Sequence, residues 1–354
     1  MAEDGRLTPA LLAFLDPSSS STPFDAMDAA FELVKRNNVL NVNPRVAEID
    51  ITTHASDFLW AWFCVLSLSA IGILAWGHMS RPIGERAFHE LAAALCFTAS
   101  IAYFAMASDL GATAVPVEFI RGGSLGENWV KLGVNDPTRS IWYARYIDWT
   151  ITTPMLLLEL ALCTGLPLSQ IFGLIFFDLV MIETGLVGAL VPSRYKWGFY
   201  AFGCAALFYI WWILLVPGRK SAMNLGSDFH KSYITSTAVL SVLWLVYPII
   251  WGLAEGGNLI TPTSEMIAYG VLDLLAKPVF SIVHLMGLSK LDYARLGMSS
   301  SKVSDGAHQT LLNEKMGPNS AGATPRPSTT VGSPTATTHG DGAGFHQHNA
   351  AAAV

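Results

Sequence analysis

Hydrophobic residues gather in seven long runs between residues 52 and 296. A helix that crosses a bilayer needs about 20 such residues, and in lipid it satisfies its own backbone hydrogen bonds. The runs cover approximately 55–77, 88–108, 139–162, 168–190, 195–216, 231–254 and 264–288. The pattern therefore predicts an all-α fold, a bundle of seven transmembrane helices, in which the third span is the least apolar.

Both ends of the chain are polar. We interpret residues 1–51 as an extracellular N-terminal tail, although residues 24–37 have the pattern of a short amphipathic helix. The first 23 residues have no apolar run behind a basic start, so we expect no cleavable signal peptide. Residues 297–354 are rich in Ser, Thr, Gly, Pro and Ala. That composition cannot bury enough apolar surface to fold, and it predicts a disordered cytoplasmic tail.

The distribution of Lys and Arg among the loops predicts the orientation. The first loop, the fifth-to-sixth loop and the C-terminal flank carry Arg81, Arg86, Arg219, Lys220, Lys231, Lys290 and Arg295. These segments lie on one side of the membrane, which we take as the cytoplasm, so the N-terminus is outside. The opposite loops are not free of cations, since they carry Arg121, Lys131, Arg194 and Lys196. We expect an integral protein of the plasma membrane.

Composition agrees with a membrane protein and excludes several other classes. Of 354 residues, 52% are hydrophobic and 14% are charged, whereas an ordinary soluble protein has about 25% charged residues. The four cysteines show no CxxC spacing, so we expect neither a metal site nor a disulfide. The chain has no phosphate-binding loop and no basic patch for nucleic acid. We predict that its main partner is the lipid bilayer and that it is not an enzyme.

Two opposite charges interrupt the last apolar run. Asp273 and Lys277 are four residues apart and share one face of a helix. Each charge at the centre of a bilayer costs roughly 2.5–3.5 kcal/mol, so a chain that carries such a pair is expected to use it. A buried lysine is also a candidate for a Schiff base.

The third span carries further ionisable groups. Asp148 and Thr152 share a face, Arg145 lies one turn before Asp148, and Glu159 follows eleven residues after it. At 1.5 Å per residue, the two carboxylates are roughly 16 Å apart along the axis. Misread loop residues or simple packing hydrogen bonds are the alternative, and Asp148, Asp273 and Lys277, three ionisable groups at mid-depth in two spans, disfavour it. The alternative has more weight for Glu159, which lies nearer the interface. We interpret Asp178 and Glu183 in the fourth span as structural hydrogen-bonding groups.

Aromatic residues recur along the sixth span. Trp244, Tyr247, Pro248 and Trp251 follow an i, i+3/4, i+7 spacing, which more often marks helix packing. Beside a buried lysine, however, aromatic walls favour a long, flat, apolar ligand.

Together these motifs resemble the microbial (type 1) rhodopsins, in particular bacteriorhodopsin and the fungal rhodopsins. The resemblance rests on Asp273 and Lys277, the string Arg-Tyr-x-Asp-Trp-x-x-Thr-Thr-Pro that ends at Pro154, the string Trp-x-x-Tyr-Pro-x-x-Trp that ends at Trp251, and the segment 183–190. It covers about residues 52–296, and it identifies this region as a seven-helix retinal-binding domain.

The resemblance implies a role for each motif residue. Lys277 would hold all-trans retinal as a protonated Schiff base, with Asp148 as primary counterion and proton acceptor and Asp273 as second counterion. Arg145 would organise the extracellular half, Thr152 would hydrogen-bond Asp148, and Glu159 would be the cytoplasmic proton donor. Glu255 and Glu265 resemble an extracellular release pair, although Glu255 matches only with a one-residue gap. The retinal walls would be Trp149, Thr153, Leu156, Met181, Gly185, Trp197, Trp244, Tyr247, Pro248 and Trp251.

These roles imply a light-driven outward proton pump. A carboxylic acid among leucines, as Glu159 is, favours its protonated form, which suits a donor. A chloride pump would lack the carboxylate at Asp148, and a sodium pump would carry Asn and Gln in place of Asp148 and Glu159. Trimers are common in the family, so the resemblance is compatible with a homo-oligomer.

Three alternatives remain. The first is a photosensor of the same fold with a slow photocycle, which these motifs do not separate from a pump. A retinal-free relative is disfavoured by Lys277, and a G-protein-coupled receptor is disfavoured by the third span. The chain also departs from bacteriorhodopsin, because its donor is Glu159 rather than Asp. Pro278 predicts a kink or bulge beside Lys277, and Leu156 suggests green absorption.

Overall fold

The computed structural model describes residues 37–117 and 137–296. The C-terminal tail 297–354 lies outside these residues, and so does the amphipathic segment 24–37 apart from Asn37. Arg121 and Lys131, which entered the argument on orientation, are likewise outside. Everything below concerns the described part of the chain.

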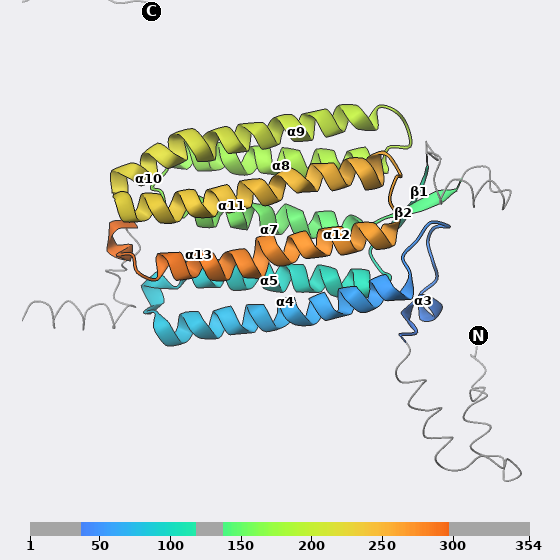
Figure 1. Ribbon diagram of the computed structural model, residues 1–354, viewed down its shortest axis with the longest axis horizontal. Helices are drawn as coiled ribbons and strands as arrows, with labels where there is room; N and C mark the ends of the chain where they lie inside the picture. The colour runs from blue at the N-terminus through green and yellow to red at the C-terminus, as the bar shows by residue number, and fades with distance from the viewer. Residues whose placement is uncertain (1–36, 118–136, 297–354) are drawn as a thin grey trace, which may run out of the picture. The chain divides into compact units, whose positions relative to one another are not determined.

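Seven helical spans lie side by side in the described residues (Figure 1). They are α4 (Thr53–Ser80), α5 (Ala87–Ala107), α7 (Tyr143–Leu162), α8 (Leu168–Leu190), α9 with α10 (Lys196–Ile213 and Arg219–Leu225), α11 (Ser227–Trp251), and α12 with α13 (Pro262–Leu274 and Phe280–Leu288). Shorter helices are α3 (Val39–Val42), η1 (Ile83–Glu85) and η5 (Tyr293–Leu296). The prediction of an all-α bundle with seven spans is confirmed.

Six of the spans are long and apolar enough to cross a membrane by composition alone. The exception is α7, because its 20 residues include Arg145, Asp148 and Glu159. The predicted start of this span at residue 139 was wrong, since residues 138–141 form a strand and the helix begins at Tyr143. The fifth span is longer than expected and continues to Leu225.

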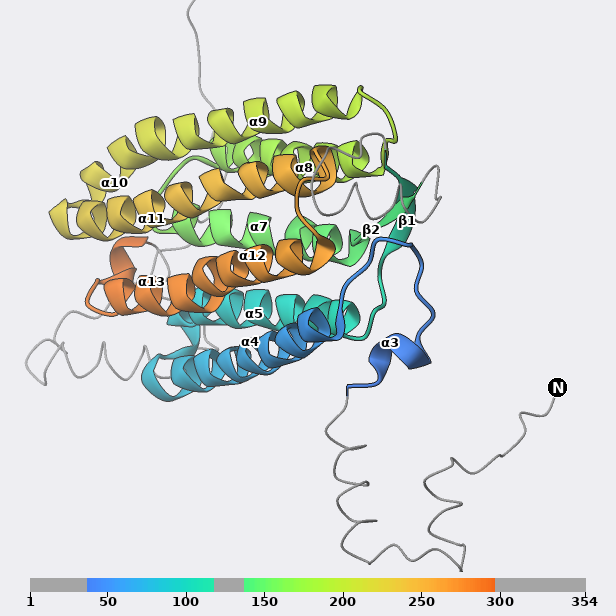
Figure 2. The same ribbon diagram turned by 45° about the vertical axis from the view of Figure 1, so that its right-hand side comes forward.

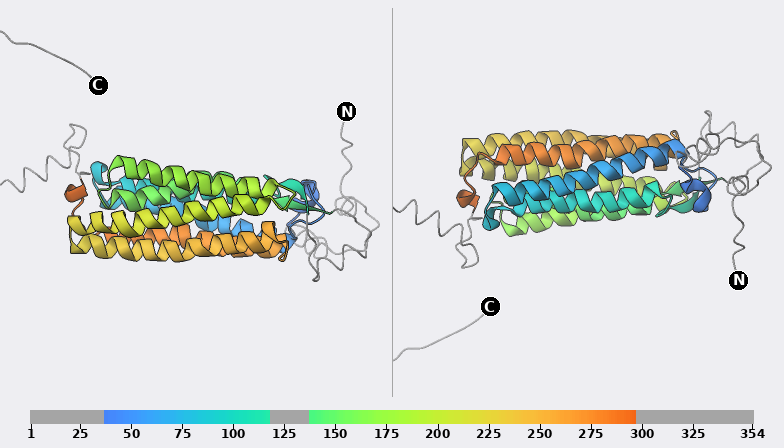
Figure 3. Two further views of the ribbon diagram at one scale, coloured as in Figure 1. Left: turned by 90° about the horizontal axis from the view of Figure 1, so that it is seen from above. Right: turned by 90° about the horizontal axis from the view of Figure 1, so that it is seen from below.

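A two-stranded sheet lies at one end of the bundle. Strands β1 (Thr113–Pro116) and β2 (Thr138–Ile141) pair antiparallel, with Thr113 opposite Ile141. Ile49 of the N-terminal segment forms a bridge to β2 at Arg139. Figure 2 shows β1, β2 and α3 together at this end, which we call the sheet end. Figure 3 shows α10 and η5 at the other end, which we call the opposite end.

The helices close into a ring. Each of α4, α5, α7, α8 and α9 contacts the next, α11 contacts α9 and α12, and α12 returns to α4. The spans α4, α7 and α12 all start at the sheet end in Figure 1. Residues that follow one another along α7 and α12 therefore advance together from the sheet end towards the opposite end.

Prolines widen the helices at two places. π-Helical turns at Leu214–Gly218 and Leu275–Val279 contain Pro217 and Pro278. Proline removes a backbone donor and crowds the preceding turn, so the helix accommodates an extra residue there. The bulge predicted at Pro278 is confirmed, and Lys277 lies within it.

Helix α12 starts with two signals in its sequence. The hydroxyl of Thr261 caps the helix by accepting a hydrogen bond from the Ser264 backbone N–H at 3.1 Å, and Pro262 occupies the first position. This start fixes Glu265 in the first turn of the helix. The carboxylate is therefore positioned where the helix dipole favours a negative charge.

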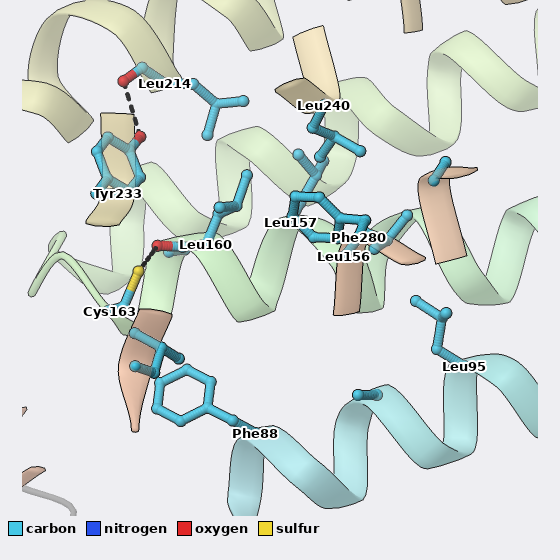
Figure 4. Packing of buried hydrophobic residues seen from close by; sticks show 14 of the residues in the cluster. Phe88, Leu95, Leu156, Leu157, Leu160, Cys163, Leu214, Tyr233, Leu240 and Phe280 are labelled. Carbon is cyan, nitrogen blue, oxygen red and sulfur yellow. Dashed lines mark hydrogen bonds between the residues drawn. The ribbon is translucent and has the colours of Figure 1, made fainter. Parts of the chain in front are cut away.

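A large apolar core fills the opposite half of the bundle. Figure 4 shows part of it, with Leu156 and Leu157 of α7 beside Phe280 of α13; Leu160 of α7 and Phe88 of α5 belong to the same cluster. Two polar atoms of this cluster donate to backbone carbonyls, the hydroxyl of Tyr233 to Leu214 at 2.8 Å and the thiol of Cys163 to Leu160 at 3.0 Å. The opposite half is therefore packed mainly with apolar side chains.

Candidate functional site

Lys277 and two carboxylates form a buried ion cluster in the middle of the bundle. The Lys277 Nζ donates a hydrogen bond to Asp148 Oδ2 and lies 3.3 Å from Asp273 Oδ2. All three side chains are at most 2% exposed. The three ionisable residues that the sequence singled out are therefore brought together from α7, α12 and the π-turn after it.

Asp273 is held by two tyrosines. The hydroxyl of Tyr247 donates to Oδ1 at 2.7 Å, and that of Tyr103 donates to Oδ2 at 2.9 Å. These bonds fix the orientation of Asp273 and stabilise its negative charge. Tyr103 was missed by the sequence reasoning, because nothing along α5 shows that its one tyrosine faces Asp273.

Thr152 also contacts Asp148, but through the main chain. Its hydroxyl donates to the Asp148 backbone carbonyl at 2.8 Å. A bond of this kind, from threonine to the residue four positions earlier, occupies the hydroxyl within the helix. The hydrogen bond expected between these two residues is present, with the carbonyl as its acceptor.

An apolar cavity extends from Lys277 between α7, α8, α9 and α11. Nine of the ten predicted wall residues line it, namely Trp149, Thr153, Leu156, Met181, Gly185, Trp244, Tyr247, Pro248 and Trp251. Trp197 does not line it. The indole of Trp197 instead packs edge-on behind Trp251, with ring centroids 6.0 Å apart, and Tyr200 takes its place at the cavity. The prediction for Trp197 was therefore wrong, because Trp251 and Tyr200 stack on each other and close that wall.

Further cavity residues come from positions with no local signal. They are Tyr146, Ile182, Tyr200, Gly203, Cys204, Leu207, Tyr269 and Ala276. These residue types are common in any buried helix, so only the assembled helices show which of them line the cavity.

The two carboxylates of α8 hydrogen-bond to threonines of α7. Thr153 donates to Asp178 Oδ2 at 2.8 Å in the buried interior, and Thr150 donates to Glu183 Oε1 at 2.9 Å on a more exposed face. The interpretation of Asp178 and Glu183 as structural hydrogen-bonding groups agrees with these contacts. The pair that includes Thr153 also fixes one wall of the cavity.

Glu255 and Glu265 come together towards the sheet end, around Arg145. Arg145 lies 2.5 Å from Glu265 Oε1 and 4.0 Å from Glu255 Oε1. The hydroxyl of Tyr146 donates to Glu255 Oε2 at 2.6 Å. The one-residue gap at Glu255 in the sequence comparison coincides with a π-turn, Gly252–Gly256. A π-turn holds one residue more than an α-turn, which accounts for the gap.

Two more buried cations lie beside this pair, and the sequence reasoning missed both. Arg139 of β2 donates to Glu265 Oε2 at 2.7 Å, and Lys196 at the start of α9 donates to the Glu255 backbone carbonyl at 3.3 Å. Both are 2% exposed. A second arginine within the expected third span was a usable signal for Arg139. Lys196 had been taken for a loop cation.

Glu159 lies alone in the apolar core of the opposite half. It is fully buried, and neither carboxyl oxygen has a hydrogen-bond partner among the described residues. Its helix neighbours Leu157 and Leu160 belong to the core seen in Figure 4. A lone carboxyl in such surroundings is far less costly as the neutral acid.

Comparisons with known proteins agree with this geometry. A family model described as bacteriorhodopsin-like protein matches residues 54–291. Protein FDD123 of Trametes versicolor is 49% identical over 76% of this chain and 90% of its own length, and the opsin-like protein carO of Fusarium fujikuroi is 46% identical over 75% and 85%.

Solved structures show the same fold. The light-driven proton pump LR (Mac) from Leptosphaeria maculans superposes with a TM-score of 0.62 at 33% identity, and covers 70% of this chain and 100% of that one. The light-driven proton pump of Coccomyxa subellipsoidea gives 0.61 at 35% identity over 67% and 97%. The family model spans more than half of the chain, and the curated relatives cover three quarters of it. The chain belongs to the bacteriorhodopsin-like family of microbial rhodopsins.

Proposed function

We propose that this protein is a light-driven outward proton pump. The observation that supports this most directly is the position of its carboxylates relative to Lys277. Asp148 and Asp273 contact the lysine, whereas Glu159 lies further along α7 towards the opposite end with no partner among the described residues. One carboxylate is placed to accept a proton, and another is placed to supply one.

The residues around Lys277 fit retinal. The cavity is lined almost wholly by apolar and aromatic side chains, and Lys277 is among the lining residues. Flat walls from Trp149, Trp244 and Trp251 suit a long conjugated polyene. When bound to the Lys277 nitrogen, retinal would supply light absorption and an isomerisation that turns this nitrogen.

Asp148 is the proposed proton acceptor. It is the carboxylate to which the Lys277 nitrogen donates, so a proton moves along an existing hydrogen bond. Asp273 also faces the lysine, but its two oxygens already accept from Tyr103 and Tyr247. Asp148 Oδ1, in contrast, has no hydrogen-bond partner among the described residues, which favours Asp148 as the acceptor.

Glu159 is the proposed donor, and its position gives the direction. It follows Asp148 by eleven residues of α7, or roughly 16 Å. Acceptance towards the sheet end and donation from the opposite half move protons out through the sheet end. With the orientation inferred from the basic loops, the sheet end is extracellular, and we place the protein in the plasma membrane.

The test is the pH of a suspension of cells that express the protein with added retinal. Under green light we expect the medium to acidify, and a protonophore should abolish the change. Asp148→Asn should form pigment without acidification. The matched control is Glu183→Gln, which alters an exposed carboxylate that hydrogen-bonds to the same helix and should leave pumping intact.

Two outcomes would contradict the proposal. If Asp148→Asn still acidifies the medium, Asp148 is not the acceptor. If the wild-type protein is coloured but no pH change appears, the slow photosensor becomes the better reading.

A further inference from the structure

A buried histidine of the opposite half has no part in the proton transfers proposed above. His284 of α13 is buried, and its Nδ1 shares a hydrogen bond of 2.8 Å with the hydroxyl of Ser236 on α11. The second ring nitrogen, Nε2, has no hydrogen-bond partner among the described residues. A neutral imidazole has one N–H and one free lone pair, so this ring can accept a proton and also release one.

His284 lies close to the level of Glu159 along the bundle. Asp148 and Asp273 contact the same lysine nitrogen, so they mark one level on α7 and α12. Glu159 follows Asp148 by eleven residues, and His284 follows Asp273 by eleven residues. At 1.5 Å per residue, both lie roughly 16 Å further towards the opposite end. The histidine is therefore at about the depth of the proposed proton donor.

Hydroxyl groups continue on both sides of His284, where α11 and α13 contact each other. Towards the opposite end, the half-buried Ser232 of α11 lies against Gly287, where an added Cβ would be 2.9 Å from the serine hydroxyl. In the other direction, Ser281 of α13 is fully buried three positions before His284. Ser232, Ser236, His284 and Ser281 thus form a polar row, which we call the serine–histidine row.

The serine–histidine row has unused hydrogen-bonding capacity. The hydroxyls of Ser232 and Ser281 and the Nε2 of His284 have no partner among the described residues. Buried polar groups in proteins are mostly satisfied by a protein partner or by ordered water. The row is therefore suited to hold water, and it leads from a half-buried position at the opposite end into the interior.

The ring of His284 lies at the boundary between this row and the apolar core. It stacks on Phe280 with ring centroids 5.6 Å apart, and it meets Phe88 of α5 edge-on at 6.3 Å. Both phenylalanines belong to the cluster that includes the helix neighbours of Glu159. These contacts from α5 and α13, and that of Ser236 from α11, carry no charge. His284 and Glu159 are thus titratable groups on two sides of the same apolar packing.

We propose that His284 is a proton relay, which refills Glu159 from the opposite end. A proton from the medium passes along the serine–histidine row to a ring nitrogen. The imidazolium then gives a proton, through water that enters the core, to the carboxylate that remains when Glu159 has donated. The ring is neutral again, and Glu159 is again the acid. The inference rests on the proposed pumping function and adds a third proton-carrying side chain to Asp148 and Glu159.

Time-resolved infrared spectroscopy of the pigment with retinal tests the proposal. The carboxyl C=O stretching band of Glu159 disappears when this residue loses its proton and returns when it regains one, and Glu159→Gln assigns the band. In His284→Gln, the amide can still bond to Ser236 but carries no proton. The band should disappear as fast as in the wild type, whereas its return should slow by about 10²-fold, as for loss of one positioned acid or base. An equally fast return would overturn the proposal.

The pH dependence separates proton transfer from packing. In His284→Gln, the rate of return should depend more steeply on pH than in the wild type, because Glu159 then takes its proton directly from the medium. A slow return with the wild-type pH dependence would mean that the ring only packs, and the inference would be wrong.

His89→Gln is the matched control. His89 is a second buried histidine, and its ring packs edge-on against Trp76 of α4. It lies outside the serine–histidine row, so its replacement should leave both the timing and the pH dependence of the Glu159 band unchanged. If His89→Gln slows the return as much as His284→Gln does, the effect is not specific to the row and the inference fails.

Failure of this inference can be distinguished from failure of the pump. If wild-type cells acidify the medium and the band returns equally fast in His284→Gln, only the inference is overturned. If wild-type cells with a coloured pigment do not acidify the medium, the proposed function fails and the inference fails with it. If His284→Gln forms no pigment, Ser236→Ala removes the hydrogen-bond partner of the ring, and an unchanged return of the band in that variant overturns the inference.

Discussion

The two halves of the bundle treat buried carboxylates in opposite ways. Towards the sheet end, Glu265 has two arginine partners, and Glu255 has Arg145 and Tyr146. In the opposite half, Glu159 has no hydrogen-bond partner among the described residues and is surrounded by leucines. The sheet-end half is a network of paired charged and polar groups, whereas the opposite half is an apolar core with one titratable group of α7 in it.

On the proposed pumping function, this difference predicts how each half would transfer a proton. A network of charged groups offers a chain of acceptors that needs little rearrangement. An apolar core favours the neutral form of a buried acid, so on the proposed function we expect water to enter or helices to move before Glu159 is reprotonated. Exit is therefore expected to depend on electrostatics, and entry on the motion of the packed helices.

The largest effect should come from removing Lys277, the cation that lies between the two halves. Lys277→Ala removes the attachment atom for retinal and leaves Asp148 and Asp273 without their shared partner. Breaking a buried ion pair costs about 3–5 kcal/mol. We expect no visible absorption band and a lower melting temperature, measured by spectroscopy and by thermal unfolding in detergent. A normal band in this variant would contradict the assignment of Lys277.

A kinetic contrast between the halves should follow from Glu159→Gln. The amide cannot donate the proton, so recovery of the resting pigment after a flash should slow by about 10²-fold at neutral pH, within the range for loss of a general acid. The slowed recovery should become faster as the pH falls, because protons then come from the medium. Asp178→Asn, which alters another buried carboxyl, is the control and should slow recovery far less.

Replacing a buried glutamate by leucine should change the stability of the fold in opposite directions in the two halves. Glu159→Leu replaces an unpartnered polar group in an apolar core, which should stabilise the fold by about 1–2 kcal/mol. Glu265→Leu leaves Arg139 and Arg145 without their shared anion, and should destabilise it by about 3–5 kcal/mol. Thermal bleaching of the two pigments measures both changes. Equal effects of the two substitutions would remove the contrast drawn above.

The smallest expected effect concerns Asp109, at the sheet end just after α5. Burial, and next the neighbouring Asp50, raises the pKa of Asp109 from 3.8 to about 6, while Arg45 acts in the other direction. The folded protein therefore binds a proton that the unfolded chain has released, and stability falls as the pH rises from about 4 to 6.

Asp109→Asn removes this loss of stability and tolerates the positive φ of 56° at this position. We expect a melting temperature a few degrees above that of the wild type at pH 7, with a gain that shrinks towards pH 4. Thermal bleaching at several pH values measures it. A gain that is independent of pH would show that the carboxylate charge is not its cause.

The spans and the ion cluster could be predicted for the same physical reason. Charges inside long apolar helices are so costly that Lys277, Asp273 and Asp148 stand out, and their spacing along the helices places them at one depth. The bulge at Pro278 follows from the chemistry of proline alone. The hydrogen-bonding role of Asp178 could also be inferred, since most buried polar groups in proteins have a hydrogen-bond partner, although Glu159 is an exception.

Other features depended on the assembled structure. Whether Trp197 or Tyr200 faces the cavity is decided by how α9 rotates against α11, which periodicity within α9 does not specify. Arg139 was expected inside a helix, but it lies in β2, which the N-terminal segment and β1 hold against the mouth of the bundle. Lys196 was taken for a loop cation, but it lies at the start of α9, and its Nζ donates to the Glu255 backbone carbonyl.

The sequence by itself determined that Asp148, Glu159, Asp273 and Lys277 are buried within the spans and at what depth, because length, hydropathy and the cost of a charge in lipid are properties of each helix alone. Only the tertiary structure decided which charges are partners. The pairing of Arg139 and Arg145 with Glu265, and the isolation of Glu159, depend on how the helices turn towards one another and on where the segments between them return. Such contacts join residues more than a hundred positions apart, and no pattern along a single helix encodes them.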